Sequence, residues 1–169
     1  KHDRTPRTMR TNNQKNKPEN KSASPRTGKR TRKRTSSQSL PALKKKVQMV
    51  FNEYIRLRDQ GKPCIACGKK RELQAGHFFP VGRYDGLRFN EDNVHGECRA
   101  CNYYDEAHLI YYSQNLLKKI GEERYEALKS AAAEYKKSGY KWSRAELLEL
   151  LAKYKTKVNQ LNQLNQLNQ

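Results

Sequence analysis

The sequence predicts a small α+β domain in which α-helices frame one short pair of extended segments. Apolar residues recur at helical spacing over residues 41–61 and again from residue 109 onwards. Between these stretches lie two Cys-x-x-Cys pairs with short extended runs beside them. With 169 residues, of which 34% are hydrophobic, the chain can form one compact domain with tails but not two ordinary domains.

The first helix is expected from Pro41, because proline is favoured in the first turn of a helix, and it ends near Gly61. Its apolar positions follow a helical repeat: Leu43, Val47, Val50, Phe51, Tyr54 and Leu57. Residues 72–79 are predicted to form a short strand that enters a loop rich in Gly and Arg. A second extended segment is predicted near residues 87–89.

Three further helices are expected in the C-terminal part of the chain. Two apolar stripes end at Gly121 and at Gly139, and glycine commonly terminates a helix. Ser143 with Glu146 has the form of a capping box at the start of the last helix. We expect these stripes to form the core, because amphipathic helices usually bury their apolar face.

Basic residues are concentrated in the N-terminal part of the chain. The first 39 residues contain no Leu, Ile, Val, Phe, Tyr or Trp, so residues 1–40 are predicted to be a disordered basic arm. The densest part of the arm contains Lys29, Arg30, Arg32, Lys33 and Arg34. The folded domain is expected over residues 41–158, and the Leu-Asn-Gln repeat of residues 159–169 is interpreted as a low-complexity tail without an assigned function.

The overall charge indicates a polyanionic partner. Lys and Arg total 36 against 17 Asp and Glu, which gives a net charge of +19 and a pI of about 9.9. A flexible basic arm binds nucleic acid by releasing counterions, and the alternative is a solubilising or localising tail. No stretch approaches the ~20 apolar residues of a membrane span, and the basic start has no apolar signal-peptide segment. We therefore expect a cytoplasmic protein that binds nucleic acid and no membrane.

Four cysteines form two pairs, Cys64-x-x-Cys67 and Cys98-x-x-Cys101, with 30 residues between them. In a chain without an export signal, such pairs favour a metal over disulfides. Two knuckles of this spacing can present four sulfur atoms to one tetrahedral ion. Because a four-thiolate site is coordinatively closed, we expect a structural Zn²⁺. The alternatives are reduced free cysteines and an iron–sulfur cluster.

Histidine and asparagine residues lie between and beside the two knuckles. His77 falls on the predicted strand, Asn93 lies in the return loop, and Asn102 follows the last cysteine where a helix should begin. This arrangement around a zinc-stapled hairpin and helix resembles the HNH, or ββα-metal, endonucleases, which implies a fold of the treble-clef type.

Four longer motifs make the resemblance to known endonucleases more specific. Their positions are 61–68 (GKPCIACG), 75–78 (AGHF), 87–93 (LRFNEDN) and 98–102 (CRACN). In this order and spacing they are similar to the NinG (Rap) family of lambdoid phages, and the likeness covers roughly residues 43–158. It implies a recombination nuclease in a bacterial host cell that acts on branched DNA such as Holliday junctions and D-loops.

The resemblance also implies a role for each matched residue. His77 would be the general base, a task for which a neutral imidazole is suited. Asn93 would tether the loop and orient His77, and Asn102 would bind a catalytic Mg²⁺ or Mn²⁺. Resolvase-type HNH enzymes commonly place an acidic ligand before the histidine, where this chain has Gly76. The remaining candidates for that ligand are Asp85, Asp92, Asp105 and His108, or phosphate and water, with Asp105 ranked first because it lies near Asn102.

Other residues near the expected site have less specific interpretations. Arg83, Arg88 and Arg99 are predicted to contact DNA phosphates. His95 and His108 match no motif position and are interpreted as ordinary polar residues. Cutting both strands of a symmetric junction favours a homodimer. Two alternatives to the nuclease are a non-catalytic zinc protein that binds DNA in phage recombination and an RNA-binding zinc protein.

Overall fold

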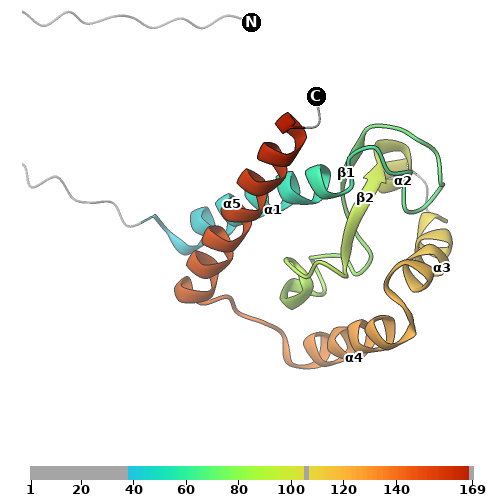
Figure 1. Ribbon diagram of the computed structural model, residues 1–169. Helices are drawn as coiled ribbons and strands as arrows, with labels where there is room; N and C mark the ends of the chain where they lie inside the picture. Colours follow the sequence, from blue (N-terminus) through green and yellow to red (C-terminus); the bar gives the residue numbers. More distant parts are fainter. Residues whose placement is uncertain (1–37, 105–106, 168–169) are drawn as a thin grey trace, which may run out of the picture. The chain divides into compact units, whose positions relative to one another are not determined.

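A computed structural model describes residues 38–104 and 107–167, which lie within one compact unit, Ser37–Gln169. Figure 1 shows a mostly helical α+β structure around one small sheet. Its elements in chain order are α1 (Leu40–Arg58), β1 (Leu73–His77), the short 3₁₀ helix η1 (Asp85–Leu87), β2 (Val94–Cys98), α2 (Arg99–Tyr104), α3 (His108–Ile120), α4 (Glu122–Ser138) and α5 (Arg144–Leu167). The α+β class predicted from the sequence is confirmed.

The sheet is a two-stranded antiparallel hairpin in which Leu73 pairs with Cys98 and His77 pairs with Val94. The prediction of a second extended segment near residues 87–89 is wrong. Leu87 belongs to η1, where its amide donates to the carbonyl of Tyr84 at 2.9 Å. All five residues of β2 are buried, so the true second strand lacks the alternation of buried and exposed positions that marks a strand in sequence.

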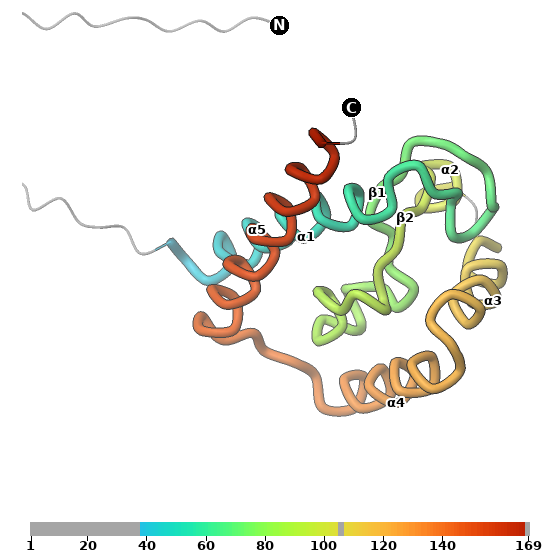
Figure 2. Tube along the Cα trace, in the orientation of Figure 1, coloured from blue at the N-terminus to red at the C-terminus, as the bar shows by residue number. Residues whose placement is uncertain are grey.

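One side of the hairpin packs against α1, and α5 lies beside α1 in Figures 1 and 2. The two helices run in the same direction, because Arg144 donates to the carbonyl of Gln38 at one end and Asn165 contacts Gln60 at the other. Their core is closed by buried side chains from both helices, the loop and β2: Leu43, Val47, Phe51, Tyr54, Ile55, Phe89, Val94, Leu147, Tyr154 and Val158. The apolar stripes of these two helices therefore lie in the core, as predicted.

A second core joins the cysteine region to α3 and α4. Figure 2 shows these two helices following one another along the chain after the hairpin. The buried members of this core include Leu73, Leu87, Tyr112, Leu116, Leu128 and Ala132, together with three of the cysteines. Gly121 separates the helices with a φ of 82°, in the left-handed region that favours glycine. The predicted stop at this glycine is confirmed.

The start of α5 shows the predicted capping box. The backbone amide of Ser143 donates to Oε2 of Glu146 at 2.7 Å, and the amide of Glu146 donates to Oγ of Ser143 at 3.2 Å. Helix α5 continues through the Leu-Asn-Gln repeat to Leu167. A period of three turns successive leucines by about 60° around a helix, so Leu161 is partly buried while Leu167 is 82% exposed.

The basic arm, with Lys29, Arg30, Arg32, Lys33 and Arg34, lies outside the described residues, as does Asp105. Within the described ranges, every helix is too short or too polar to serve as a membrane-crossing segment.

Candidate metal centre and histidine pocket

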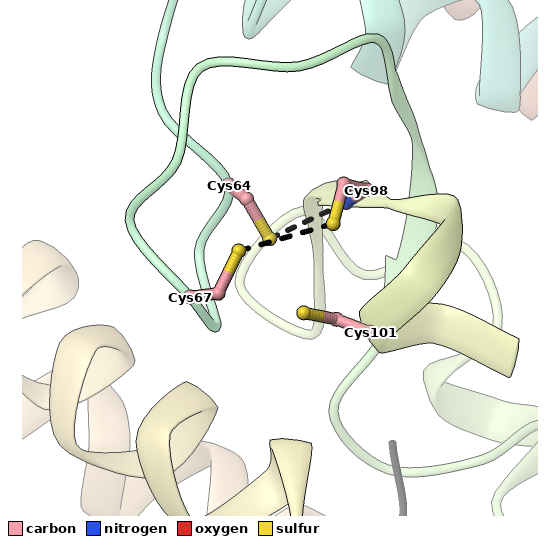
Figure 3. Close-up of side chains that lie close together, drawn as sticks. All are labelled: Cys64, Cys67, Cys98 and Cys101. Carbon is pink, nitrogen blue, oxygen red and sulfur yellow. Dashed lines mark hydrogen bonds between the residues drawn. The ribbon is translucent and has the colours of Figure 1, made fainter. Parts of the chain in front are cut away.

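The four cysteines lie together at one end of the hairpin (Figure 3). Cys64 and Cys67 come from the turn between α1 and β1, whereas Cys98 ends β2 and Cys101 lies in α2. Their sulfur atoms all lie within 4.8 Å of one another, and the Sγ atoms of Cys67 and Cys98 are 3.9 Å apart. Tetrahedral Zn–S bonds of about 2.3 Å would separate two sulfurs by about 3.8 Å. The donor set therefore fits a metal ion such as zinc.

Backbone hydrogen bonds shape the first knuckle and fix it to the hairpin. The amide of Cys64 donates to the carbonyl of Lys69 at 3.0 Å, and the amide of Gly68 donates back to the carbonyl of Cys64 at 2.9 Å. Gly68 has a φ of 69°, which explains why a glycine ends this turn. The amide of Ile65 donates to the carbonyl of Gly96 in β2 at 3.0 Å. Both cysteine pairs are thus anchored to the same strand.

The second knuckle is placed by the transition from strand to helix. Because Cys98 is the last residue of β2 and α2 starts at the next position, one turn of helix returns Cys101 to the same side. The amide of Cys98 also donates to Sγ of Cys64 at 3.3 Å, a bond typical of a thiolate environment. Three of the cysteines are buried and Cys67 is exposed. Cys67, Cys98 and Cys101 also line a surface pocket of about 330 Å³.

His77 ends β1 and is partly buried. Its Nε2 atom lies 3.0 Å from the carbonyl oxygen of Arg88. Since a carbonyl oxygen can only accept, Nε2 carries the proton and Nδ1 keeps a lone pair. Burial lowers the pKa of His77 below its ordinary 6.5, and the bond to Arg88 offsets part of that shift. The imidazole is therefore neutral near pH 7 and able to accept a proton.

The side chain of Arg88 is held away from His77 by other partners. Its Nε donates to Oδ1 of Asp85 at 2.5 Å, and its Nη1 donates to Oε1 of Gln48 at 3.0 Å. Lys44 also donates to Asp85, at 2.9 Å. Burial acts to raise the pKa of Asp85, but these hydrogen bonds outweigh it and hold the pKa below its usual range. This network fixes the backbone carbonyl that orients His77.

Asn93 closes the loop between the two strands. Its Oδ1 accepts from the amide of Phe79 at 2.8 Å, and its Nδ2 donates to the carbonyls of Phe79 and Leu87, both at 3.1 Å. The residue is fully buried. These bonds hold residues 79 and 87 together, which places the carbonyl of Arg88 beside the end of β1. Asn93 thus has the tethering geometry that the resemblance implies, and its catalytic role stays a prediction.

A pocket of about 260 Å³ brings His77 together with Asn102. Its lining residues are His77, Phe78, Pro80, Val81, Asn102, His108 and Leu109. Nδ2 of Asn102 lies 3.5 Å from Oε1 of Gln74. His108, which the sequence analysis gave as one possible ligand of the catalytic ion but otherwise as an ordinary polar residue, starts α3 and lines this pocket. Within the described part of the chain, the pocket lining contains two imidazoles and one amide but no carboxylate.

Sequence reasoning missed Glu97, a fully buried residue of β2. Its Oε1 lies 2.6 Å from Nδ1 of His108. Its other carboxylate oxygen lies against the Cα of Gly76, where a Cβ atom would overlap it. No sequence signal marks Glu97, because its closeness to Gly76 follows from the strand register.

The other predicted residues lie away from this lining. Asp92 forms an ion pair with Arg124, and Arg83 and Arg99 are exposed. His95 is buried, with Nδ1 3.1 Å from Nη2 of Arg58 and Nε2 3.1 Å from the carbonyl of Asp92. Burial and the nearby Lys119 and Arg58 lower the pKa of His95 to about 3. His95 therefore stabilises the structure as a neutral ring.

The fold and the cysteine cluster define a small α+β protein with a four-thiol centre that can hold a metal ion such as zinc. The family model described as Bacteriophage Lambda NinG protein matches residues 1–165, and the chain belongs to this NinG family. Protein ninG of Escherichia phage lambda is 33% identical over 116 residues, covering 68% of this chain and 54% of that protein.

A similar match is found with Protein ninG of Salmonella phage P22, which is 32% identical over 116 residues and is covered over 55% of its length. Protein ninG of Enterobacteria phage H19B is 35% identical over 88 residues, or 51% of this chain and 44% of that protein. The chain thus spans about half the length of the curated relatives it matches. No solved structure shows a significant match.

Proposed function

We propose that this protein is an HNH-type, metal-dependent DNA endonuclease that cleaves branched recombination intermediates such as Holliday junctions and D-loops. The observation that carries the proposal is the hydrogen bond from Nε2 of His77 to the carbonyl of Arg88. It leaves Nδ1 as a base in a pocket that also contains Asn102. A hairpin followed by α2 beside four clustered thiols supports the proposal, because a ββα-metal motif has the same order of elements.

Hydrolysis of a phosphodiester begins with removal of a proton from the attacking water. In the proposed reaction Nδ1 of His77 takes that proton, and the water oxygen attacks phosphorus in line with the 3′ oxygen. The P–O3′ bond breaks as the new P–O bond forms, and the leaving 3′ oxygen takes a proton from solvent water. The products are a 5′-phosphate and a 3′-hydroxyl. Asn93 acts as a positioning residue, because it fixes the loop whose carbonyl orients His77. Zinc in the thiol cluster would be structural, with no open position for water.

A catalytic Mg²⁺ or Mn²⁺ bound beside Asn102 would offset the negative charge that develops on the phosphate and on the leaving oxygen. The amide of Asn102 can supply one oxygen ligand, since its Nδ2 faces Gln74. The net charge of +19 supports DNA as the partner, and exposed Arg83 and Arg99 offer contacts to phosphates. A homodimer that cuts both strands of a symmetric junction and a site of action in the host cytoplasm are parts of the same proposal.

The test is a nicking assay on a labelled four-way DNA junction, with and without Mg²⁺ or Mn²⁺. The proposal predicts cleavage that requires the ion and exceeds the cleavage of a matched linear duplex. Parallel gel shifts with the junction, the duplex and a folded RNA at two salt concentrations compare the possible partners. Equal or tighter binding of the RNA would support the RNA-binding alternative.

A second candidate function is a zinc protein that binds DNA without cutting it. The feature that favours it is Gly76, which leaves the position before His77 without an acidic ligand. Junction binding together with no nicking of any DNA substrate, under any divalent ion, would establish this alternative.

A further inference from the structure

His108 has one ring nitrogen fixed and the other available. Nδ1 lies 2.6 Å from Oε1 of Glu97, and Glu97 is fully buried in β2. The side chain of His108 is 18% exposed and lines the pocket that contains His77 and Asn102. Because Glu97 accepts the Nδ1 proton, Nε2 is the nitrogen that can bind a further group.

A buried carboxylate behind a histidine is the usual support for a metal-bound imidazole. It fixes the tautomer and the ring orientation, and it raises the basicity of the nitrogen that binds the metal. Asn102 is arranged in a comparable way. Its Nδ2 donates to Oε1 of Gln74, which leaves Oδ1 as the atom that can bind a metal ion. Two side chains of one pocket therefore each offer one ligand atom.

The other candidate ligands among the described residues are engaged elsewhere. Asp85 is held by Lys44 and Arg88, and Asp92 pairs with Arg124. Gly76 has no side chain, and the carboxylate of Glu97 fills the adjacent space. A side chain at position 76 would collide with Glu97. Among the described residues, Glu97 is instead the carboxyl group that stands behind a pocket residue, His108.

We propose that Nε2 of His108 and Oδ1 of Asn102 bind a divalent transition-metal ion, with Glu97 as the carboxylate behind His108. A site with an imidazole ligand suits Mn²⁺ better than Mg²⁺, which prefers oxygen ligands in a regular octahedron. The proposal rests on the proposed nuclease function for the use of the ion, although binding itself can be measured without cleavage.

The experiment titrates the zinc-loaded full chain with Mn²⁺ and follows free Mn²⁺ by its EPR signal, with Mg²⁺ as a competitor. The expected result is one Mn²⁺ site that Mg²⁺ displaces poorly. His108→Phe keeps a ring of similar shape without nitrogen, and it should weaken Mn²⁺ binding by tenfold or more. Glu97→Gln should weaken it by about 10- to 100-fold, the range measured for such supporting residues.

Asp92→Asn is the matched control, because it removes a carboxylate outside the pocket, and its Mn²⁺ affinity should equal that of the unchanged protein. Zinc content and circular dichroism show whether each variant is folded. If His108→Phe fails to fold, His108→Ala takes its place in the same titration. Unchanged Mn²⁺ affinity in a folded His108 variant, or equal affinity for Mg²⁺, would overturn the proposal.

The same samples separate this inference from the nuclease proposal. Mn²⁺ binding that depends on His108, in a protein that nicks no DNA, supports the metal site and contradicts the nuclease. Nicking by the unchanged protein, together with Mn²⁺ binding that does not depend on His108, supports the nuclease and contradicts this metal site.

Discussion

The carboxylate of Glu97 occupies the space that a side chain at Gly76 would need. The two residues lie on neighbouring strands, with Gly76 paired to His95 and Glu97 paired to Gln74. Both the carboxylate and Cβ of Glu97 would lie too close to a Cβ atom at position 76. The glycine before His77 is therefore a requirement of this hairpin, because a buried acid from the opposite strand already fills the position.

The first prediction concerns that contact. Gly76→Ala should lower the free energy of unfolding by about 1–3 kcal/mol, the usual cost of overpacking a filled site. Urea denaturation of the zinc-loaded protein measures the change. Gly82→Ala is the control, because nothing lies within 4 Å of its added Cβ atom.

A double-mutant cycle makes the test specific. In a Glu97→Gly background, Gly76→Ala should lower the free energy of unfolding by less, because the atoms that oppose the added Cβ are absent. An equal loss of unfolding free energy from Gly76→Ala in both backgrounds would show that Glu97 is not the reason why position 76 requires glycine.

Asn93 is predicted to be a strong determinant of stability. Asn93→Ala leaves the amide of Phe79 and two carbonyls without their partner, and each buried unsatisfied group costs about 1–3 kcal/mol. We expect a loss of at least ~2 kcal/mol by chemical denaturation. Asn159→Ala, at an exposed position of α5, should change stability by less than about 0.5 kcal/mol. A similarly small loss of stability in both variants would refute the tethering role of Asn93.

Removal of the metal should unfold the hairpin region. The thiol cluster joins two segments that share a small core, so bound zinc contributes to folding directly. We expect about one equivalent of Zn²⁺ per chain, and a strong chelator should reduce the thermal stability. Co²⁺ in place of zinc should show the thiolate charge-transfer absorption of a four-sulfur site, which Cys98→Ser should weaken. Full stability after complete zinc removal would contradict a structural centre.

Acid should destabilise the protein through His95. Its folded-state pKa of about 3 lies below the ordinary 6.5 of an unfolded histidine, so the unfolded chain binds more protons below pH 6.5. This contribution to stability is complete above pH 6.5 and is lost as the pH falls, by at most about 1.4 kcal/mol per pH unit. Denaturation at several pH values between 6.5 and 4.5 measures the slope. His95→Gln places a side chain that does not titrate at this position and should reduce the slope of stability against pH. An unchanged slope would show that other groups cause the pH dependence.

The sequence predicted the elements whose signals are local. Apolar stripes located the helices, Gly121 located one helix end, and the pair Ser143 and Glu146 located the start of α5. Cysteine spacing predicted that four sulfurs meet, because two knuckles of that length can present all four sulfur atoms to one ion.

The remaining features depend on contacts that no local pattern records. Strand β2 is buried on both faces and contains His, Gly and Glu, so its composition does not resemble a strand. Leu87 and Phe89 are apolar and buried because they pack into the two cores, although the backbone turns there and forms no strand. The pairing of His108 with Glu97 joins the start of α3 to β2, two elements that no local sequence pattern connects.

The most direct test of the central claim is single-turnover nicking of a four-way junction by His77→Ala and His77→Gln. Glutamine can still donate to the carbonyl of Arg88 but offers no imidazole base, so it separates structure from chemistry. The account predicts that both variants keep zinc and junction affinity and that both lose cleavage by about 100-fold or more. Cleavage by folded His77→Gln at the rate of the unchanged protein would contradict it.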